Sequence, residues 1–352
     1  TRMEQRAMTH FQFTEADQTF VAREVEPFLP DRIFDAHAHL FCKNHYAPGT
    51  APTHLQNAPE CLGLDEYARF SEWLHPGGRV VGGLFFGLAF TGDRAGNNRF
   101  VAEQVQPGGI FGNRARGQLV VAPEDDPDWV RQAVARGGFV GLKVYHTMAH
   151  TDGPTWQAPI PAYFPETFAR IADEMGLTVT LHMVRERALA DPVNQAAIRD
   201  YCQRFPNLRL ILAHAARGFN PWHTIEGIHS LAGLPNVWCD TSAVTEAGAF
   251  EAIVDVLGHE RLLYGTDFHV SHLRGRCVAI GDSFHWLYAD EMDLSENHTS
   301  LRPVLIGLES LRSLALACRR LKLSDGQVED VFYNNAAELF SLESLTPLQK
   351  AI

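Results

Sequence analysis

The sequence of 352 residues predicts an α/β fold in which eight parallel strands close into a (β/α)8 TIM barrel. Eight short apolar segments recur along the chain, and we expect a helix after each, a pattern typical of a parallel sheet buried on both faces. Eight such units favour a closed barrel over an open doubly wound sheet. The nucleotide-binding form of the open sheet lacks support, because no G-x-G-x-x-G or P-loop motif follows a strand. We expect the strands at 32–39, 79–90, 118–122, 139–145, 177–182, 208–214, 236–240 and 261–264.

Local signals mark the helices in chain order. Thr14 is typical of a helix N-cap, and Pro30 ends the helix that follows it. Pro127 opens a helix after the third strand, and Gly176 fits the C-terminal cap of the helix before the fifth strand. We predict one domain over 1–352, with its barrel core at about 30–345, a helix before it and extra helices after it. The expected helices are 14–28, 64–74, 127–136, 162–175, 191–204, 223–232, 245–257, 302–322 and 324–341.

The first strand ends in two histidines, His37 and His39. Alternate residues of a strand point to the same side, so these two imidazoles project in parallel. Two neutral imidazoles at this spacing supply half of a metal site. Polar residues at a strand end would be the simpler interpretation, so the prediction depends on whether later strands supply further ligands.

Later strand ends carry residues of the same chemical type. The fourth strand contains Lys143, the fifth ends at His182 and the sixth ends at His214. Asp267 follows the eighth strand directly. Because the C-terminal ends of the strands of a barrel open onto one face, we expect these side chains to converge there on a divalent metal ion.

Four motifs carry a family resemblance. They are FDAHAHL at 34–40, LAHAA at 212–216, YGTDF at 264–268 and YNNAAELF at 333–340. These motifs resemble those of the amidohydrolase superfamily, and the flanking residues resemble its amidohydrolase 2 branch. That branch includes hydrolases, lactonases, hydratases and non-oxidative decarboxylases on metal-dependent barrels. The resemblance covers about residues 30–345.

The resemblance implies a role for each of the strand-end residues. It makes His37, His39 and His182 metal ligands, and it makes Asp267 a ligand that also accepts a proton from the activated water. It makes His214 either a ligand of a second metal or the general acid/base. The implied cofactor is one or two divalent ions, with zinc as the first candidate and manganese or iron as alternatives. Such an ion lowers the pKa of a bound water toward about 7.

Lys143 has three open interpretations. In binuclear members of the superfamily a lysine on the fourth strand is carbamylated and bridges two metals, and Lys143 stands at the matching place. Many members of the resembling branch hold one metal, in which case an unmodified lysine could pair with a substrate oxyanion as a point charge. A structural role is the third interpretation.

Basic residues gather in the loops that follow the strands. The candidates for substrate binding are Lys43, Arg185, Arg217 and Arg274. An arginine fork suits a carboxylate, so we expect an anionic small-molecule substrate. Solvated loop charges, or ion pairs with acidic residues, are the alternative. The segment 268–300 is long for a loop of this kind, and its apolar content predicts an ordered lid or a subunit contact.

Composition narrows the class of protein. The formal net charge of −12 argues against non-specific binding of nucleic acid. No segment approaches 18 consecutive apolar residues, so we expect no membrane span. The six cysteines are scattered without a C-x-x-C spacing, which predicts reduced thiols in a cytoplasmic protein. A symmetric homo-oligomer is a further expectation, taken from the resemblance.

These observations lead to one functional prediction with two rivals. We expect a metal-dependent hydrolase, in which metal-activated water attacks an ester, lactone or amide of a small carboxylate-bearing substrate. A metal-dependent decarboxylase or lyase of the same branch would use the same residues. A metal-stabilised binding protein is the third interpretation, and it fits less well because structural zinc sites are closed by four ligands rich in cysteine.

Overall fold

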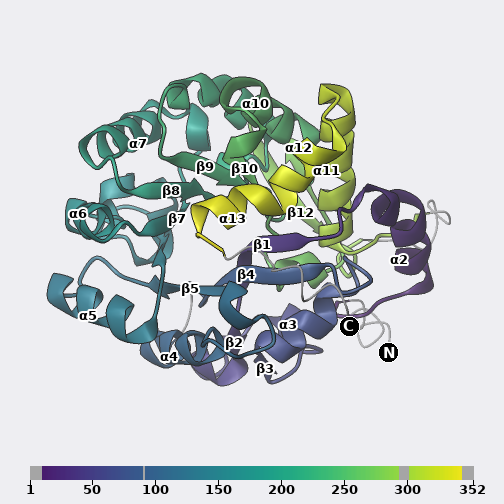
Figure 1. Cartoon of the computed structure of the whole chain (residues 1–352), viewed down its shortest axis with the longest axis horizontal. Coiled ribbons are helices and arrows are strands. Elements are labelled where there is room, and N and C mark those ends of the chain that lie inside the picture. The colour runs from purple at the N-terminus through teal and green to yellow at the C-terminus, as the bar shows by residue number, and fades with distance from the viewer. Residues whose placement is uncertain (1–9, 90–91, 293–300, 343–352) are drawn as a thin grey trace.

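Eight parallel strands form the centre of the computed structural model, which describes residues 10–89, 92–292 and 301–342. Their order in the sheet is β1-β4-β5-β6-β7-β8-β9-β10, so barrel strands that follow one another along the chain lie side by side (Figure 1). Their bounds are β1 Ile33–His39, β4 Val80–Phe86, β5 Ala115–Val120, β6 Gly141–Tyr145, β7 Thr178–His182, β8 Arg209–Leu212, β9 Val237–Asp240 and β10 Leu262–Leu263.

Backbone hydrogen bonds bring the last strand back to the first. Ala36 N donates to Tyr264 O at 2.8 Å, and His39 N donates to Phe268 O at 2.7 Å. The predicted (β/α)8 barrel is therefore confirmed. The strand expected at 79–90 is shorter in the structure, and its last residue, Phe90, lies outside the described residues, as do 343–345 of the predicted core. The single-domain assignment and the homo-oligomer stay predictions.

Helices surround the barrel on its outside (Figure 1). The predicted N-cap at Thr14 is confirmed, since its hydroxyl accepts a hydrogen bond from Asp17 N. The helix at 94–104 was not among the predicted elements. The surrounding helices are α2 Glu15–Phe20, α3 Leu64–Ser71, α4 Arg94–Gln104, α5 Pro127–Gly137, α6 Glu166–Met175, α7 Pro192–Arg204, α9 Pro221–Gly227, α10 Ala247–Leu257, α11 Ile306–Leu321 and α12 Asp325–Glu329.

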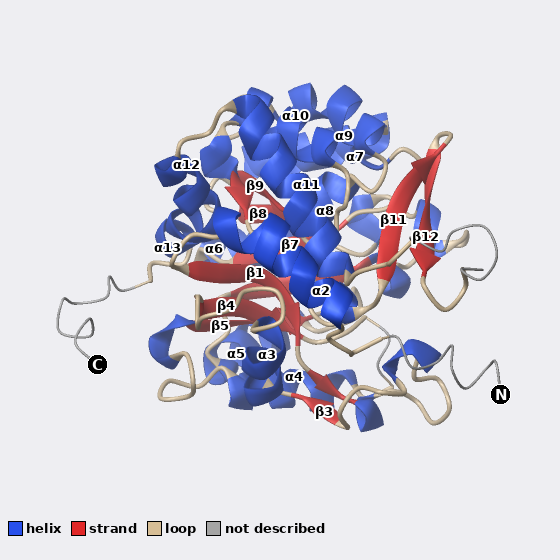
Figure 2. Ribbon diagram, turned by 90° about the vertical axis from the view of Figure 1, so that its right-hand side faces the viewer, coloured by secondary structure: helices blue, strands red, loops and turns tan. Residues whose placement is uncertain are grey.

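The two ends of the barrel are covered differently. The short helix α13, Asn335–Leu339, lies across the amino-terminal end, and Phe340 beyond it stacks on Phe34 of β1 at 5.5 Å between ring centroids. At the opposite end stands the hairpin of β11, Gly275–Ile280, and β12, Ser283–Tyr288 (Figure 2). The segment expected to be an ordered lid or subunit contact thus contains a hairpin, and its residues 293–300 lie outside the described residues.

Two cysteines correct the prediction of six reduced thiols. Cys42 and Cys61 form a disulfide across the two-stranded sheet of β2, Phe41–Cys42, and β3, Cys61–Leu62. The bridge closes the loop that follows β1, because antiparallel pairing places the two residues opposite one another. Disulfides are rare in the cytoplasm, so the cysteine pattern no longer supports the predicted location. The other four cysteines are buried and free.

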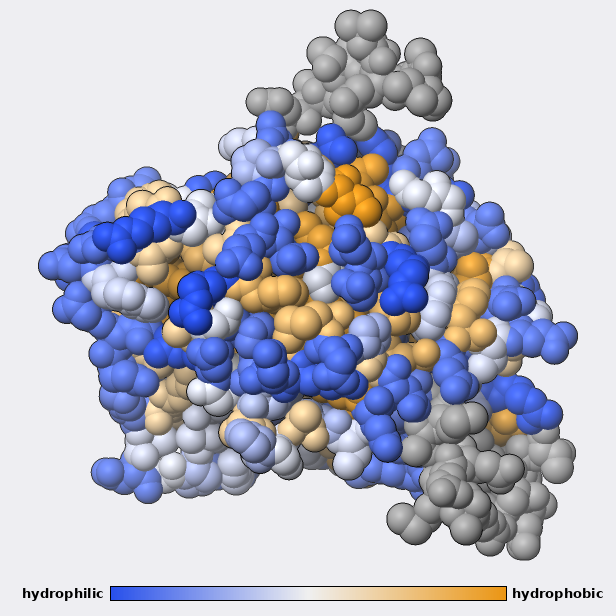
Figure 3. All heavy atoms as spheres, turned by 90° about the horizontal axis from the view of Figure 1, so that it is seen from below, coloured by the Kyte–Doolittle hydropathy of each residue, from blue (hydrophilic) through white to orange (hydrophobic). Residues whose placement is uncertain are grey.

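One face of the molecule is mainly polar (Figure 3). The face seen in Figure 3 is mostly hydrophilic, with apolar side chains showing between charged ones. Large apolar side chains that are exposed, such as Trp222 of α9 and Ile280 of β11, come from different elements. Among the helices of the described residues, none is long and apolar enough to cross a bilayer.

Candidate active site

The two histidines at the end of β1 hold fixed orientations. Nδ1 of His37 lies 2.8 Å from Oδ2 of Asp240, and Nδ1 of His39 lies 3.1 Å from the carbonyl oxygen of Gly87. A carboxylate and a carbonyl only accept, so in each ring Nδ1 carries the proton and donates it. Nε2 of both rings is therefore left with a free lone pair.

Asp267 faces both of these lone pairs. Its Oδ1 lies 3.0 Å from Nε2 of His39 and 3.6 Å from Nε2 of His37. Burial alone would raise the pKa of Asp267, but the neighbouring imidazoles of His39 and His214 outweigh burial and lower that pKa. The carboxylate is thus ionised at neutral pH.

Two lone pairs and a carboxylate oxygen that face one another repel unless a cation lies between them. The ligand atoms of His37, His39 and Asp267 all lie within 4.8 Å of one another, and all three residues are buried. Nitrogen and oxygen donors of this kind suit zinc, manganese and similar divalent ions. The residues present therefore fit the metal that the sequence led us to expect.

Asp240, at the end of β9, is a candidate functional residue that the sequence analysis missed. It is fully buried, and its two oxygens have different partners. Oδ2 binds His37, and Oδ1 accepts a hydrogen bond from His214 N at 2.9 Å. The hydroxyl of Ser242 also donates to it. A carboxylate that orients a metal-binding imidazole is common around metal sites. The signal was present in the sequence, because Asp240 ends an expected strand just as the chosen residues do.

His214 lies just past the barrel wall. The strand predicted at 208–214 ends at Leu212, so His214 stands two residues beyond β8. Its Nδ1 lies 3.0 Å from the carbonyl oxygen of Ser242, to which it donates, so Nε2 is unprotonated. Its ring centroid is 4.9 Å from that of His37. Burial lowers the pKa of His214 and keeps the ring neutral, so it can act as a base or as a ligand.

The turn that carries His214 is left-handed. The four residues from His214 to Arg217 have φ between 52° and 60°, and none of them is glycine. This conformation costs about 1–2 kcal/mol per residue, so surrounding contacts must hold it. The hydroxyl of Thr224 supplies one of them by donating to Ala215 O at 2.8 Å.

His182 lies beside His214, with ring centroids 4.9 Å apart. Its Nδ1 is buried and has no hydrogen-bond partner among the described residues, so the ring is available as a further ligand. Burial, followed by the proximity of His214, lowers the pKa of His182 well below its usual value. Its ligand atom does not belong to the close group formed by His37, His39 and Asp267.

Lys143 is fully buried beside the β1 histidines. Its Nζ lies 3.4 Å from Nε2 of His37 and sits over the rings of Phe86 and Tyr145, at 4.3 and 5.0 Å from their centroids. Burial lowers the pKa of Lys143 to about 7. A cation on His37 would repel an ammonium at this distance, so a neutral amine or a carbamate suits the metal-loaded site better.

Comparisons with known proteins identify the family. The family model described as "Amidohydrolase" matches residues 34–342, which is most of the chain. The chain belongs to the amidohydrolase family. It is accordingly an enzyme, as predicted, and its His and Asp cluster is a candidate site for a divalent metal.

One curated relative of this amidohydrolase is an L-fucono-1,5-lactonase from Burkholderia ambifaria. The two are 33% identical over 117 residues, which cover 28% of this chain and 39% of the lactonase. The chain thus matches well under half of that relative's length.

Three solved structures share the fold at low sequence identity. A probable 2-pyrone-4,6-dicarboxylic acid hydrolase from Acinetobacter baumannii, with citric acid bound, has a TM-score of 0.56 at 16% identity, covering 88% of this chain and 100% of its own. A dihydroxybenzoic acid decarboxylase from Polaromonas, with manganese and an inhibitor bound, has a TM-score of 0.54 at 15% identity, covering 90% and 98%. An amidohydrolase from Burkholderia multivorans, with zinc bound, has a TM-score of 0.53 at 17% identity, covering 89% and 100%.

A cavity of about 490 Å³ opens beside the turn that carries His214, since Arg217 of that turn lines it. Arg185, a second predicted substrate residue, lines it too, and pairs with Asp191 at 2.7 Å. The other lining residues are Trp156, Glu186, Asp282, Ser283 and Phe284.

Arg217 is the cation of this cavity that lacks an acidic partner. It has no carboxylate within 4.0 Å among the described residues, and its guanidinium donates to Met183 O at 3.2 Å. Burial lowers the pKa of Arg217, but a guanidinium stays protonated at neutral pH. The two acidic residues that line the cavity differ in state, because Asp282 is already paired with Arg187 whereas Glu186 is exposed to solvent.

The other two predicted substrate residues are engaged elsewhere. Arg274 is 5% exposed and donates to both carboxylate oxygens of Asp17, at 2.9 and 2.7 Å, so its fork already holds a carboxylate. We therefore leave Arg274 out of the substrate site; it ties the N-terminal helix to the barrel. Lys43 pairs with Glu60 at 3.3 Å, in the loop that the disulfide closes.

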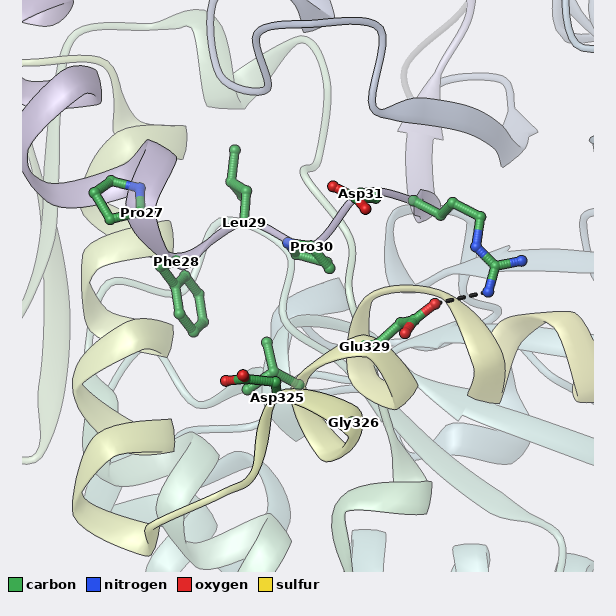
Figure 4. Close-up of a pocket in the computed structure, with 10 residues that line it drawn as sticks. Pro27, Phe28, Leu29, Pro30, Asp31, Asp325, Gly326 and Glu329 are labelled. Atoms are coloured by element: carbon green, nitrogen blue, oxygen red, sulfur yellow. Dashed lines mark hydrogen bonds and ion pairs between the residues drawn. The ribbon is translucent and has the colours of Figure 1, made fainter. Parts of the chain in front are cut away.

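A larger cleft, of about 900 Å³, lies away from these residues (Figure 4). The chain just before β1 forms one side of it and α12 the other, and Arg32 and Glu329 join across it at 2.6 Å. Residues that precede β1 lie at the amino-terminal end of the barrel, whereas barrel active sites lie at the carboxyl end. The histidine and aspartate cluster, not the larger cleft, is the candidate active site.

Proposed function

We propose that this amidohydrolase is a metal-dependent hydrolase that cleaves an ester, lactone or amide in a small carboxylate-bearing substrate. The observation that carries the proposal is the convergence of two unprotonated Nε2 atoms, from His37 and His39, on the ionised Asp267. A divalent ion held by these three residues, with zinc as the first candidate, would polarise the substrate carbonyl and lower the pKa of the attacking water.

The protein's own residues would divide the other tasks between them. Asp267 would accept the proton of the attacking water, because its carboxylate is ionised and lies at the cluster. His214, with Nε2 free, would take that proton over from Asp267 and then donate it to the leaving oxygen or nitrogen. His182 would complete the ligand set, since its ring has an unpartnered nitrogen. Arg217 would hold the substrate carboxylate, because it is a half-buried cation without an acidic partner among the described residues.

Decarboxylation is the second candidate function, favoured by the likeness to the manganese-containing decarboxylase. The same metal ligands would orient the substrate, the carboxylate would leave as carbon dioxide, and a proton would take its place on the same carbon. The partial likeness to the lactonase favours hydrolysis instead.

An assay of the metal-loaded enzyme separates the two functions. We expect ring opening of at least one lactone from a panel that includes L-fucono-1,5-lactone and 2-pyrone-4,6-dicarboxylate, and loss of this activity after chelation. Carbon dioxide release from a dihydroxybenzoate, without ring opening of any lactone, would support decarboxylation. Turnover that survives complete metal removal would contradict both.

The state of Lys143 is tested by counting metal ions and weighing the intact protein. One ion and an unmodified chain would support a free amine at Lys143. Two ions and the added mass of carbon dioxide would support a bridging carbamate.

A further inference from the structure

The β11–β12 hairpin presents one aromatic face to the barrel. In β12 the side chains of Phe284, Trp286 and Tyr288 are half-buried against the core, and the residues between them are exposed. Such alternation places the three rings on one face of the strand. The hairpin thus adds an aromatic wall at the carboxyl end of the barrel.

The tip of the hairpin is anchored to the barrel. Nδ2 of Asn220 donates to the carbonyl oxygens of Gly281 and Ser283, at 3.1 and 3.0 Å. The carboxylate of Asp282 pairs with His223 at 3.2 Å and with Arg187 at 3.1 Å. These contacts fix the position of the wall, and they offset the charge of Asp282 at the cavity.

Ring contacts connect this wall to the candidate acid/base. Phe219 stacks on His214 with centroids 5.1 Å apart, and it contacts Phe284 at 5.0 Å and Trp286 at 5.3 Å. The guanidinium of Arg217 lies 5.3 Å from the centroid of Phe284. The aromatic wall, the cation without an acidic partner and His214 are therefore neighbours.

Trp156 lines the same cavity from another loop. It is 45% exposed, although a tryptophan of a folded protein is usually largely buried. Its backbone is held, since Arg185 N donates to Trp156 O at 2.9 Å. The cavity lining thus combines an exposed indole and the Phe284 ring with the Arg217 cation.

We propose that Trp156 and Phe284 determine substrate specificity. They would hold the apolar body of a substrate whose carboxylate is bound by Arg217. This inference rests on the proposed function, because it places the substrate carboxylate at Arg217. It adds that the enzyme distinguishes between acids by their apolar part, because that part binds more tightly when it packs against aromatic rings. The carboxylate alone does not determine which acid is bound.

Binding of simple acids to the metal-loaded enzyme tests this directly. The probes are acetate, cyclohexanecarboxylate and benzoate, which share the charge and differ in the apolar body. Calorimetry should show that the wild type binds the two larger acids at least about tenfold more tightly than acetate. Phe284→Ala and Trp156→Ala should each reduce this ratio about two- to tenfold. Arg217→Gln should weaken all three acids by a similar factor.

Two kinds of control variant keep the test decisive. Trp129→Ala removes another exposed tryptophan, on α5, and should leave the ratio unchanged. Phe284→Tyr and Trp156→Phe keep an aromatic ring and should retain most of the ratio, which separates loss of the ring from loss of folding.

Three results would overturn the inference. They are a wild-type ratio near one, an unchanged ratio in both alanine variants, and wild-type affinity of the Arg217→Gln variant for all three acids. If the ratio of the affinities for the larger acids and for acetate changes as expected but no hydrolysis is measured, the proposed hydrolase is wrong. The role of Trp156 and Phe284 in binding the apolar body is then retained.

Discussion

Asp240 Oδ2 lies 2.8 Å from His37 Nδ1, so that a carboxylate at the end of β9 fixes the proton on the imidazole at the end of β1. The free Nε2 of His37 therefore faces Asp267. This relationship makes metal affinity depend on a residue that need not touch the metal.

Asp240→Asn should weaken metal binding. The amide can no longer accept as strongly from Nδ1 of His37, and loss of such a partner commonly costs about 10- to 100-fold in metal affinity. Titration of the metal-free protein with zinc and with manganese measures this. Asp255→Asn, at an exposed position of α10, is the matched control and should bind as the wild type does. Equal affinities for the Asp240 variant and the wild type would contradict the assigned role.

His214→Asn should lower kcat by about 10²- to 10⁴-fold, the usual contribution of a general acid/base. Its metal content should stay at the wild-type level if the ring transfers protons and is not needed as a ligand. Steady-state kinetics and metal analysis of the same samples decide between the two roles. A variant that loses its metal would show that His214 is a ligand.

Arg274→Met should destabilise the fold by about 3–5 kcal/mol, because it leaves the fully buried Asp17 without its cation. The double variant Arg274→Met with Asp17→Leu should lose less, since no charge is then buried alone. Urea unfolding followed by circular dichroism measures both. The exposed pair of Arg320 and Glu251 serves as the control, and Arg320→Ala should cost no more than about 1 kcal/mol.

His75 should make the fold sensitive to acid. Its Nδ1 donates to Ser71 O and its Nε2 accepts from the hydroxyl of Tyr264 at 2.6 Å, so the buried ring is held neutral. Burial lowers the pKa of His75 to about 3. Between that value and the unfolded value near 6.5, only the unfolded chain gains the proton, so stability falls as pH falls through this window.

The free energy of unfolding measured between pH 6 and pH 4 tests this sign. His75 alone should contribute a slope of about 1.4 kcal/mol per pH unit. His75→Gln should be less stable at neutral pH and should show a shallower slope by about that amount. Parallel curves for the variant and the wild type would refute the assignment.

Lys322→Gly should stabilise the protein. Lys322 caps α11 with φ of 57°, a left-handed conformation that favours glycine, and its side chain is exposed. Relief of the backbone strain exceeds the entropy that glycine adds to the unfolded chain, which leaves a gain of about 0.5–1 kcal/mol. Thermal unfolding measures the gain. Lys322→Ala keeps the strain and should be nearly neutral.

Strand periodicity and strand ends were enough to predict the barrel and most of the residues of the cluster. His37, His39 and Asp267 meet because a closed parallel barrel brings its strand ends to one face. The helix α4 was missed because its sequence, RAGNNRFVAEQ, has few apolar residues and only Asp93 as a cap signal.

The missed features depend on contacts between distant residues. Arg274 fitted the pattern of a substrate residue, but its guanidinium forms an ion pair with Asp17, 257 positions away in the sequence. The left-handed turn from His214 contains no glycine that would have marked it. Cys42 and Cys61 form no motif, and only the pairing of β2 with β3 brings them together. A single sequence carries no local signal for any of these.

The disulfide has a practical consequence for preparing the enzyme. It ties both ends of the loop that carries His54, whose ring stacks on His269 at 6.0 Å, and Cys61 is open to solvent. A purification buffer with dithiothreitol would reduce the Cys42–Cys61 disulfide. This would remove a restraint on the unfolded chain that stabilises the fold by about 3 kcal/mol. Oxidising expression hosts and thiol-free buffers are therefore the conditions under which this loop keeps its shape.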